Sequence, residues 1–196
     1  MNLSRNNRRL DNAVVVFGEG RNLGKLSFRE SSSKVYMTME DEDCAVVFTT
    51  GMGEIPVNFK AETNGNYTLS FTNEEVTFSY LHLIDNMTGI ETNLLETPYY
   101  TFNAQTTDYA SRFRLVFATG SSVDGETFAF LNSSGDLAIF GIEGEATLQV
   151  VDVLGHILSS ETFSGSYEKK LNVAPGVYLL RLINGDNVKV QKIIIK

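Results

Sequence analysis

The chain has 196 residues, of which 42% are hydrophobic and 11% aromatic, so it can fold around one large or two modest cores. Its formal net charge of −8 argues against nucleic acids and anionic membrane surfaces as partners, because both attract a basic face. No run approaches the roughly 18 apolar residues of a membrane span.

Short strand-like runs separated by turn signals follow one another over residues 11–118, and none of them has the period of a helix. Asn64-Gly65 is typical of a two-residue hairpin turn. Residues 90–96 are less regular, and we expect a loop there that pins Leu94 and Leu95 to the core. The pattern predicts an all-β first domain over residues 11–118, a jelly-roll-like or Ig-like β-sandwich.

Small, polar and acidic residues mark a domain boundary at 118–126. Beyond it, strand-like alternation resumes, and Gly155 indicates a turn. Pro175-Gly176 predicts a type II turn, because proline fixes φ near −65° and glycine accepts a positive φ. We therefore predict a second all-β domain over residues 127–196, a smaller Ig-like sandwich of about seven short strands.

Three motifs in this second half carry a family resemblance: VVDVLGH at 150–156, APGVYLLR at 174–181 and KVQKIIIK at 189–196. In this order and at the C-terminus, they resemble the type A C-terminal sorting domain of Bacteroidetes proteins that the type IX secretion system exports. The resemblance implies an export signal and no catalytic activity. The residues that match the pattern of the family are Asp152, Gly155, Pro175, Gly176, Tyr178, Leu180, Lys189 and Lys192.

The same resemblance implies partners and a location. The outer-membrane secretion machinery would recognise the domain after passage through the periplasm, and a sortase-like peptidase would cut within residues 118–126. The product would be secreted or held at the cell surface. Residues 1–12 are charged but lack the apolar core of a signal peptide, so we expect the chain to be the C-terminal part of a longer protein.

The first half has a resemblance of its own, carried by LIDNMTG at 83–89, NLL at 93–95 and TDYASRF at 107–113. These motifs are similar to the β-sandwich that often precedes the sorting domain in large Bacteroidetes surface proteins. That similarity implies a structural spacer and supplies no ligand.

The last strand-like run, residues 188–195, includes three consecutive isoleucines and is followed by Lys196. Left at the edge of a sheet, such a run would template pairing with other chains, and Lys192 and Lys196 would restrain this. Two interpretations stay open: it is a last core strand, or the export machinery recognises its edge, by strand addition among other means.

Few residues suggest catalysis or metal binding. Cys44 is the single cysteine, and its apolar neighbours predict a small buried hydrophobe. The two histidines, His82 and His156, lie far apart in the chain and are too few for a multi-histidine zinc site. No G-x-S-x-G motif is present. We expect no catalysis and no cofactor.

Two further possibilities concern binding. The acidic stretches 41–43 and 85–86 could hold calcium, although solvated turns explain them as well and neither has the spacing of a calcium loop. Tyr99, Tyr100 and Tyr109 could form an aromatic platform for a sugar ring, although core packing is the simpler explanation of these tyrosines. The alternative function is therefore a carbohydrate- or host-surface-binding β-sandwich, with a glycan as its partner.

Overall fold

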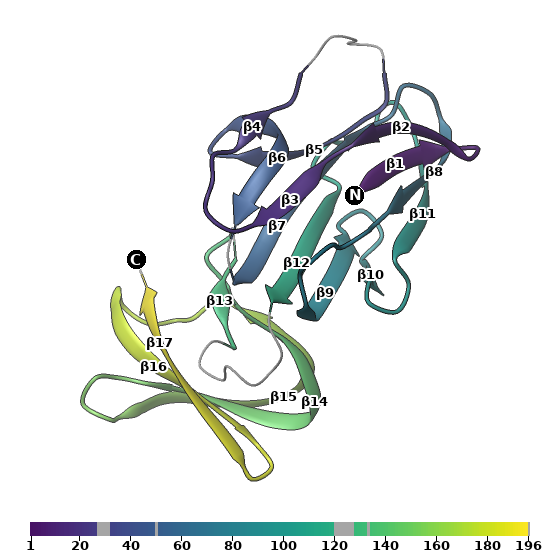
Figure 1. Ribbon diagram of the computed structural model, residues 1–196. Coiled ribbons are helices and arrows are strands. Elements are labelled where there is room, and N and C mark those ends of the chain that lie inside the picture. The colour runs from purple at the N-terminus through teal and green to yellow at the C-terminus, as the bar shows by residue number, and fades with distance from the viewer. Residues whose placement is uncertain (27–31, 50, 120–127, 133, 196) are drawn as a thin grey trace. The chain divides into compact units, whose positions relative to one another are not determined.

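The computed structural model of the protein describes residues 1–26, 32–49, 51–119, 128–132 and 134–195. Every regular element in these ranges is a β-strand, which confirms the predicted all-β class (Figure 1). They contain no helix long and apolar enough to cross a membrane. The chain divides into two compact units, Met1–Thr119 (unit 1) and Gly120–Lys196 (unit 2).

Unit 1 contains two sheets. The smaller sheet has four strands in the order β11-β8-β1-β2, namely β1 (Asn2–Arg5), β2 (Arg8–Asn12), β8 (Gly65–Ser70) and β11 (Tyr99–Ala104). The larger sheet has the order β10-β9-β12-β7-β5-β6-β3, with β4 paired to β6. Its strands are β3 (Val14–Phe17), β4 (Leu23–Gly24), β5 (Lys34–Met39), β6 (Glu42–Thr49), β7 (Met52–Lys60), β9 (Phe78–Asp85), β10 (Ile90–Asn93) and β12 (Phe113–Thr119).

Unit 1 includes the residues that precede the predicted start of the first domain. Strand β1 pairs with both β2 and β8, and Leu3 in its centre is fully buried. The sequence MNLSRNNRRL therefore forms a β-hairpin of the smaller sheet, whose turn residues Asn6 and Asn7 both have positive φ. Asparagine tolerates this left-handed conformation better than most residues, which suits it to such a tight turn.

The hairpin predicted at Asn64-Gly65 is wrong. Strand β7 pairs with β12 and β5, whereas β8 pairs with β1 and β11, so the turn carries the chain from one sheet to the other. The dipeptide does turn the chain, but the identity of the next partner depends on contacts that lie far away in sequence.

The loop predicted over residues 90–96 is only partly correct. Its first four residues form strand β10, which pairs with β9. Leu94 is buried as expected, and its N–H donates to the carbonyl of Leu81 at 2.9 Å. Leu95 is 48% exposed, because it follows Leu94 directly and points away from the core.

The core of unit 1 is rich in edge-to-face aromatic pairs. The ring of Phe102 lies 5.0 Å from Phe59 and 4.9 Å from Phe113, both at steep interplanar angles. Such pairs contribute about 0.5–1.5 kcal/mol beyond the burial of their area. The aromatic residues thus fix the packing of β7, β11 and β12 against one another.

Unit 2 contains five strands in its described residues, and not the seven short strands predicted. They are β13 (Phe130–Leu131), β14 (Leu137–Val151), β15 (Ile157–Lys169), β16 (Gly176–Asn184) and β17 (Asn187–Ile195). The order is β13-β14-β16-β17, with β15 on the other side of β14. Strands β14 and β15 have 15 and 13 residues, so they replace pairs of shorter strands.

Glycines bend the long β14–β15 hairpin without breaking it (Figure 1). Gly141, Gly144 and Gly165 have φ between 71° and 76°, and the register of the pair shifts on both sides of Ile142. Bulges of this kind increase the bend and twist of a strand. The two halves of β14 therefore line one buried cluster, with Ile139 before the bend and Leu148 after it.

Gln191 of β17 also anchors Phe128 and Ala129, the first two described residues of unit 2. The side-chain carbonyl of Gln191 accepts the N–H groups of Phe128 and Ala129, at 2.7 and 2.9 Å, and its amide donates to the carbonyl of Ala129 at 2.6 Å. Three hydrogen bonds from one side chain replace a strand pairing at this place. Phe128 and Ala129 are thereby kept in the core of unit 2.

Candidate functional site

Asp152 organises the turn between β14 and β15. Its Oδ1 atom accepts the N–H groups of Leu154 and His156 at 2.9 and 2.8 Å, and its Oδ2 atom lies 2.9 Å from Nδ1 of His156. The backbone hydrogen bond from His156 is the largest of the contacts that lower the pKa of the Asp152 carboxyl group. Gly155 has φ 90°, a conformation that a side chain disfavours. Asp152 and Gly155 therefore form one turn.

The predicted type II turn at Pro175-Gly176 is wrong, because Gly176 does not have a positive φ. Gly176 is instead the first residue of β16, opposite Ile195. A Cβ atom at this position would lie 3.6 Å from the ring of Tyr178, in ordinary van der Waals contact. The Tyr178 hydroxyl donates to the carbonyl of Ala174 at 2.6 Å and so holds the chain where it enters the strand.

The remaining residues of the family pattern fall on both faces of the β16–β17 hairpin. Leu180 is fully buried and belongs to the core. Lys192 is exposed and lies opposite Leu179, whereas Lys189 is half-buried and lies opposite Leu182. Neither lysine forms an ion pair with another described residue. The pattern thus combines residues that build the fold with cations that stay available.

The outward face of the same sheet is unusually apolar. The register places Ile157, Val151, Leu179 and Lys192 in one row across four strands. Large apolar side chains with 39–55% exposure recur over this face, and a contiguous group of this kind commonly marks an interaction site. They are Ile157, Val177, Leu179, Val188, Val190 and Ile194.

The last strand also presents an open backbone edge. In the described residues β16 is the one strand that pairs with β17, through a two-residue turn at Gly185-Asp186. Asn184 and Asn187 flank this turn as a hydrogen-bonded pair, and such pairs alternate along antiparallel strands. The N–H and C=O groups of Val188, Val190, Lys192 and Ile194 therefore point away from β16.

Sequence reasoning missed most of this surface. Arg181 lies on the outward face in the row next to Lys192, opposite Val190, and adds a second cation. Reading every second residue of each strand would have found these positions, but only once the cross-strand register was known. Of the segment 118–126, Ala118 and Thr119 end β12, and residues 120–126 lie outside the described residues, as does Lys196.

The candidates of unit 1 have structural partners. Cys44 is 1% exposed and its Sγ atom donates to the carbonyl of Glu42 at 3.5 Å, so it is the buried hydrophobe expected; burial raises the pKa of its thiol. Nδ1 of His82 lies 2.7 Å from Glu91, and the His82 ring stacks on Tyr80 with centroids 3.9 Å apart.

Asp85, one of the calcium candidates, is fully buried in an ion pair with Arg112. Nη2 of Arg112 lies 2.9 Å from Oδ2 of Asp85, and Tyr100 donates its hydroxyl to the same oxygen at 3.0 Å. Burial raises the pKa of Asp85, but the Arg112, Met87 and Tyr100 hydrogen bonds outweigh this and lower it. In the described ranges no three acidic, histidine or cysteine side chains are grouped as a metal site would require.

The tyrosines of the suggested sugar platform have different surroundings. Tyr100 is committed to Asp85 and stacks on Phe102 with ring centroids 5.9 Å apart. Tyr99 and Tyr109 are 54% and 49% exposed. Adjacent residues of a strand face opposite sides, so Tyr99 faces solvent where Tyr100 faces inward.

Comparison with known proteins bears on unit 2. Residues 133–196 match the family model of the secretion system C-terminal sorting domain. This match covers the Asp152 turn and both strands of the β16–β17 hairpin, and it confirms the predicted resemblance. No curated protein matches the chain, and no solved structure does.

Unit 2 therefore belongs to a class of domains that act as export signals. More particularly, residues 133–196 form a type IX C-terminal sorting domain, which indicates export to the cell surface or secretion.

Proposed function

We propose that this chain is a non-catalytic region of an exported protein, in which unit 2 is the signal and unit 1 is a structural spacer. The outer-membrane secretion machinery reads unit 2 through the outward face and open edge of the β16–β17 hairpin. The observation that carries this proposal is the combination of exposed valine, leucine and isoleucine side chains with cations that form no ion pair with another described residue, on strands that the sorting-domain match covers.

The hairpin offers two modes of recognition at once. The edge of β17 that faces away from β16 pairs with no other described strand, and its N–H and C=O groups can pair with an extended segment of a partner. Lys192 lies on the edge strand β17 and Arg181 on its neighbour β16, and both would favour an acidic partner, because complementary charge accelerates encounter and excludes wrong partners. The Asp152 turn and the Tyr178 hydrogen bond keep the surface in shape and do not need to touch the partner.

The spacer role of unit 1 is supported by the surroundings of its buried carboxylate and its thiol, which do not suit catalysis. The buried carboxylate of Asp85 is neutralised by Arg112, and the Cys44 thiol is buried with a raised pKa, so neither is poised as a base or a nucleophile. After export, a sortase-like peptidase cuts within residues 118–126 and unit 1 stays outside, secreted or attached to the surface.

The proposal is tested by fusing residues 120–196 to a periplasmic reporter in a host that has type IX export. We expect the reporter to appear in the medium or at the cell surface, and to stay in the periplasm in a host without the secretion machinery. A fusion to residues 1–119 is the matched control and should stay in the periplasm in both hosts. A reporter that stays in the periplasm with residues 120–196 attached would contradict the signal function.

The spacer role needs a separate measurement. Unit 1 in the full chain should show no hydrolase activity towards peptide, ester and glycoside substrates, and no ligand on a glycan array. Binding of one glycan class would instead assign unit 1 the carbohydrate-binding function, with exposed Tyr99 and Tyr109 as the first residues to replace.

A further inference from the structure

The turn that joins β14 to β15 carries a run of exposed apolar side chains. Residues 153–158, which we call the tip, are six consecutive exposed residues. Val153 and Leu154 are 71% and 78% exposed, and Ile157 and Leu158 are 55% and 47% exposed. Consecutive residues of a turn and its flank point in several directions, so the tip is open to solvent on more than one side.

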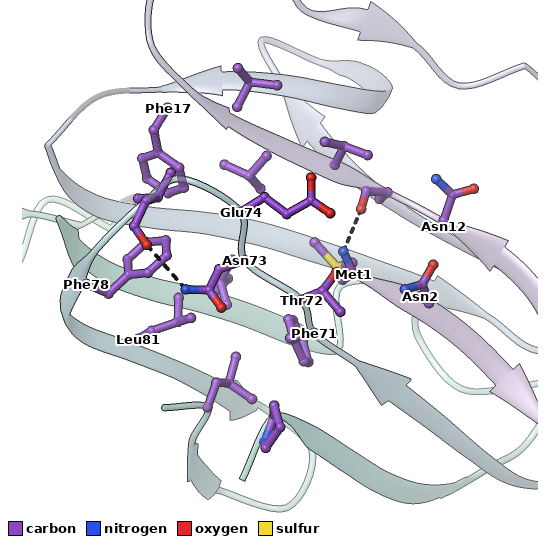
Figure 2. A pocket seen from close by; sticks show the side chains of 18 of the residues that line it. Met1, Asn2, Asn12, Phe17, Phe71, Thr72, Asn73, Glu74, Phe78 and Leu81 are labelled. Carbon is purple, nitrogen blue, oxygen red and sulfur yellow. Dashed lines mark hydrogen bonds between the residues drawn. The ribbon is translucent and has the colours of Figure 1, made fainter. Parts of the chain in front are cut away.

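The apolar side chains that line a pocket of unit 1 have different surroundings (Figure 2). This pocket has a volume of about 850 Å³, and its lining includes Phe17, Phe71 and Phe78. All three rings are partly buried and pack against the core of unit 1. A concave lining of this kind is covered from behind by its own core, whereas a convex tip is not. A flat surface would cover one side of the tip, so the occupant that suits it is one that surrounds it.

The backbone of the tip already satisfies several of its own donors. Oδ1 of Asp152 accepts the N–H groups of Leu154 and His156 at 2.9 and 2.8 Å, and the carbonyl of Asp152 accepts the N–H of Gly155 at 3.1 Å. These three consecutive N–H groups therefore need no water as a partner. An N–H group without a partner is costly to move into an apolar medium, and the turn avoids this cost at all three positions.

A row of polar residues lies behind the tip. Ser160, Gln149 and Arg181 are neighbours across β15, β14 and β16. Along β14 this row is two residues from Val151, which pairs with Ile157, and two strand residues span about 7 Å. Apolar elements that lie in a membrane interface enter it by about 5–10 Å. The apolar zone of the tip thus has the depth of an interfacial anchor.

The charges of the chain favour a partner surface without net charge. Residues 153–160 contain no aspartate, glutamate, lysine or arginine. The net charge of −8 opposes adsorption to anionic lipid headgroups. Nδ1 of His156 lies 2.9 Å from the carboxylate of Asp152, and a histidine ring combines an apolar body with a polar edge, which suits the boundary between lipid and water. The surface that fits the tip is therefore a zwitterionic one.

We propose that the tip inserts into the outer part of a zwitterionic lipid bilayer. Val153 and Leu154 enter the beginning of the acyl chains, Ile157 and Leu158 follow at the level of the glycerol groups, and the polar row of Ser160 stays among the headgroups. The sorting-domain match indicates export, which brings the chain to a membrane, and insertion of the tip holds unit 2 at that surface. This inference goes beyond the export function and does not depend on which face the secretion machinery recognises.

The first experiment uses the absence of tryptophan from the chain. Leu154→Trp places a single indole on the tip of the whole chain, which is mixed with phosphatidylcholine vesicles. We expect the emission to shift to the blue and to be quenched by lipids brominated near the headgroup end of the acyl chains. The control is Val190→Trp on the outward face of β17, whose emission should not change. A shift for Val190→Trp and none for Leu154→Trp would contradict insertion of the tip.

The second experiment removes the apolar side chains and keeps the turn. Val153→Ser with Leu154→Ser leaves the hydrogen bonds of Asp152 in place, so the unfolding midpoint should not change, whereas the fraction of the chain that floats with the vesicles should fall about tenfold. The matched control, Val188→Thr with Val190→Thr, removes two exposed apolar side chains of β17 and should float like the unchanged chain. Equal losses in the two double variants would overturn the proposal.

The composition of the vesicles completes the test. Adding phosphatidylglycerol should not increase binding, and binding that requires this anionic lipid would overturn the proposal. So would an absence of flotation at about 5 mM lipid, well above the roughly 0.1 mM at which one myristoyl chain is half bound, and the tip would then be free to enter a pocket of a protein partner. Because no secretion machinery is present, this result and that of the export experiment are independent.

Discussion

Unit 1 and unit 2 are both built from strands, but they place their charges differently. In unit 1 the Asp85–Arg112 pair is 0% and 3% exposed, and Arg112 also lies over the rings of Phe102 and Phe113. In unit 2 the ion pairs are at the surface, as between Lys169 and Glu161, whose side chains are 57% and 39% exposed. Removing one partner of a buried ion pair leaves an unpaired buried charge and strongly lowers stability. Surface ion pairs contribute little to stability.

The two units also differ in where they place their apolar side chains. In the larger sheet of unit 1, Val35 and Met37 are fully buried and Val57 is as well. In unit 2, half of the apolar side chains of the β16–β17 hairpin face outward and are exposed, among them Leu179, Val190 and Ile194. Both units expose large apolar side chains, but unit 2 gathers several of them on the outward face of one hairpin. This difference is what we expect between a spacer and a signal.

The largest expected effect concerns the buried pair. Arg112→Ala leaves the carboxylate of Asp85 buried without its cation, so the free energy of unfolding of unit 1 should fall by about 3–5 kcal/mol. The unfolding of unit 2 should not change. Urea denaturation followed by tyrosine fluorescence, with hydrogen exchange to assign each transition, measures both.

The matched control is Lys169→Ala, which removes an exposed ion pair of unit 2. Its effect should be below about 1 kcal/mol. An equal loss for Arg112→Ala and Lys169→Ala would remove the distinction between the two units.

The second prediction separates the two faces of β16. Leu180→Ala opens a cavity in the core of unit 2 and should lower its free energy of unfolding by about 2–5 kcal/mol. Leu179→Ala, one residue earlier, removes a side chain that is 39% exposed and should cost clearly less. Denaturant titration of the two variants decides this, and similar losses would mean that the outward face is covered in solution.

The third prediction concerns a feature that the units share. Tyr67 donates its hydroxyl to the carbonyl of Thr63, and Tyr178 donates to that of Ala174, each at 2.6 Å and four residues back. Tyr178→Phe should cost about 1 kcal/mol. Tyr67→Phe should cost more, since this hydroxyl also bonds the buried Ser33 at 3.1 Å. Thermal unfolding of the two variants gives the order, and a larger loss for Tyr178→Phe would contradict it.

The smallest expected effect is a dependence on pH. Because the net effect of its contacts is to lower the pKa of Asp85, this group stabilises unit 1 above about pH 4, and the contribution disappears as the pH falls through the lowered pKa. In Arg112→Ala the sign should reverse, because protonation relieves an unpaired buried charge. Unfolding midpoints of unit 1 between pH 7 and about pH 2.5 test this, and a midpoint that falls with pH equally in both proteins would contradict it.

The sequence predicted the class of the fold because alternation within a strand is local. The turn at Gly155 could be predicted for the same reason. What the sequence could not reveal was pairing between distant strands. The Asn64-Gly65 turn shows this, since it joins two sheets instead of two neighbouring strands.

The count of strands in unit 2 was wrong for a related reason. Gly141 and Gly144 look like ends of short strands, but β14 continues through them because β15 bends with it at Gly165. The buried pair was also out of reach, because Asp85 and Arg112 are 27 residues apart and each is an ordinary charged residue in the sequence. The outward face could be recognised only after the register had placed its residues in rows.

The central claim is that the secretion machinery recognises unit 2 through its outward face. The most direct test is to measure export of a reporter fused to residues 120–196 that carry both Arg181→Glu and Lys192→Glu. Both side chains lie on the outward face, so we expect an unchanged unfolding midpoint and a reporter that stays in the periplasm. The control, Lys169→Glu with Lys170→Glu, changes the same charge on β15 and its flank and should be exported. Normal export of the first variant would contradict recognition through this face.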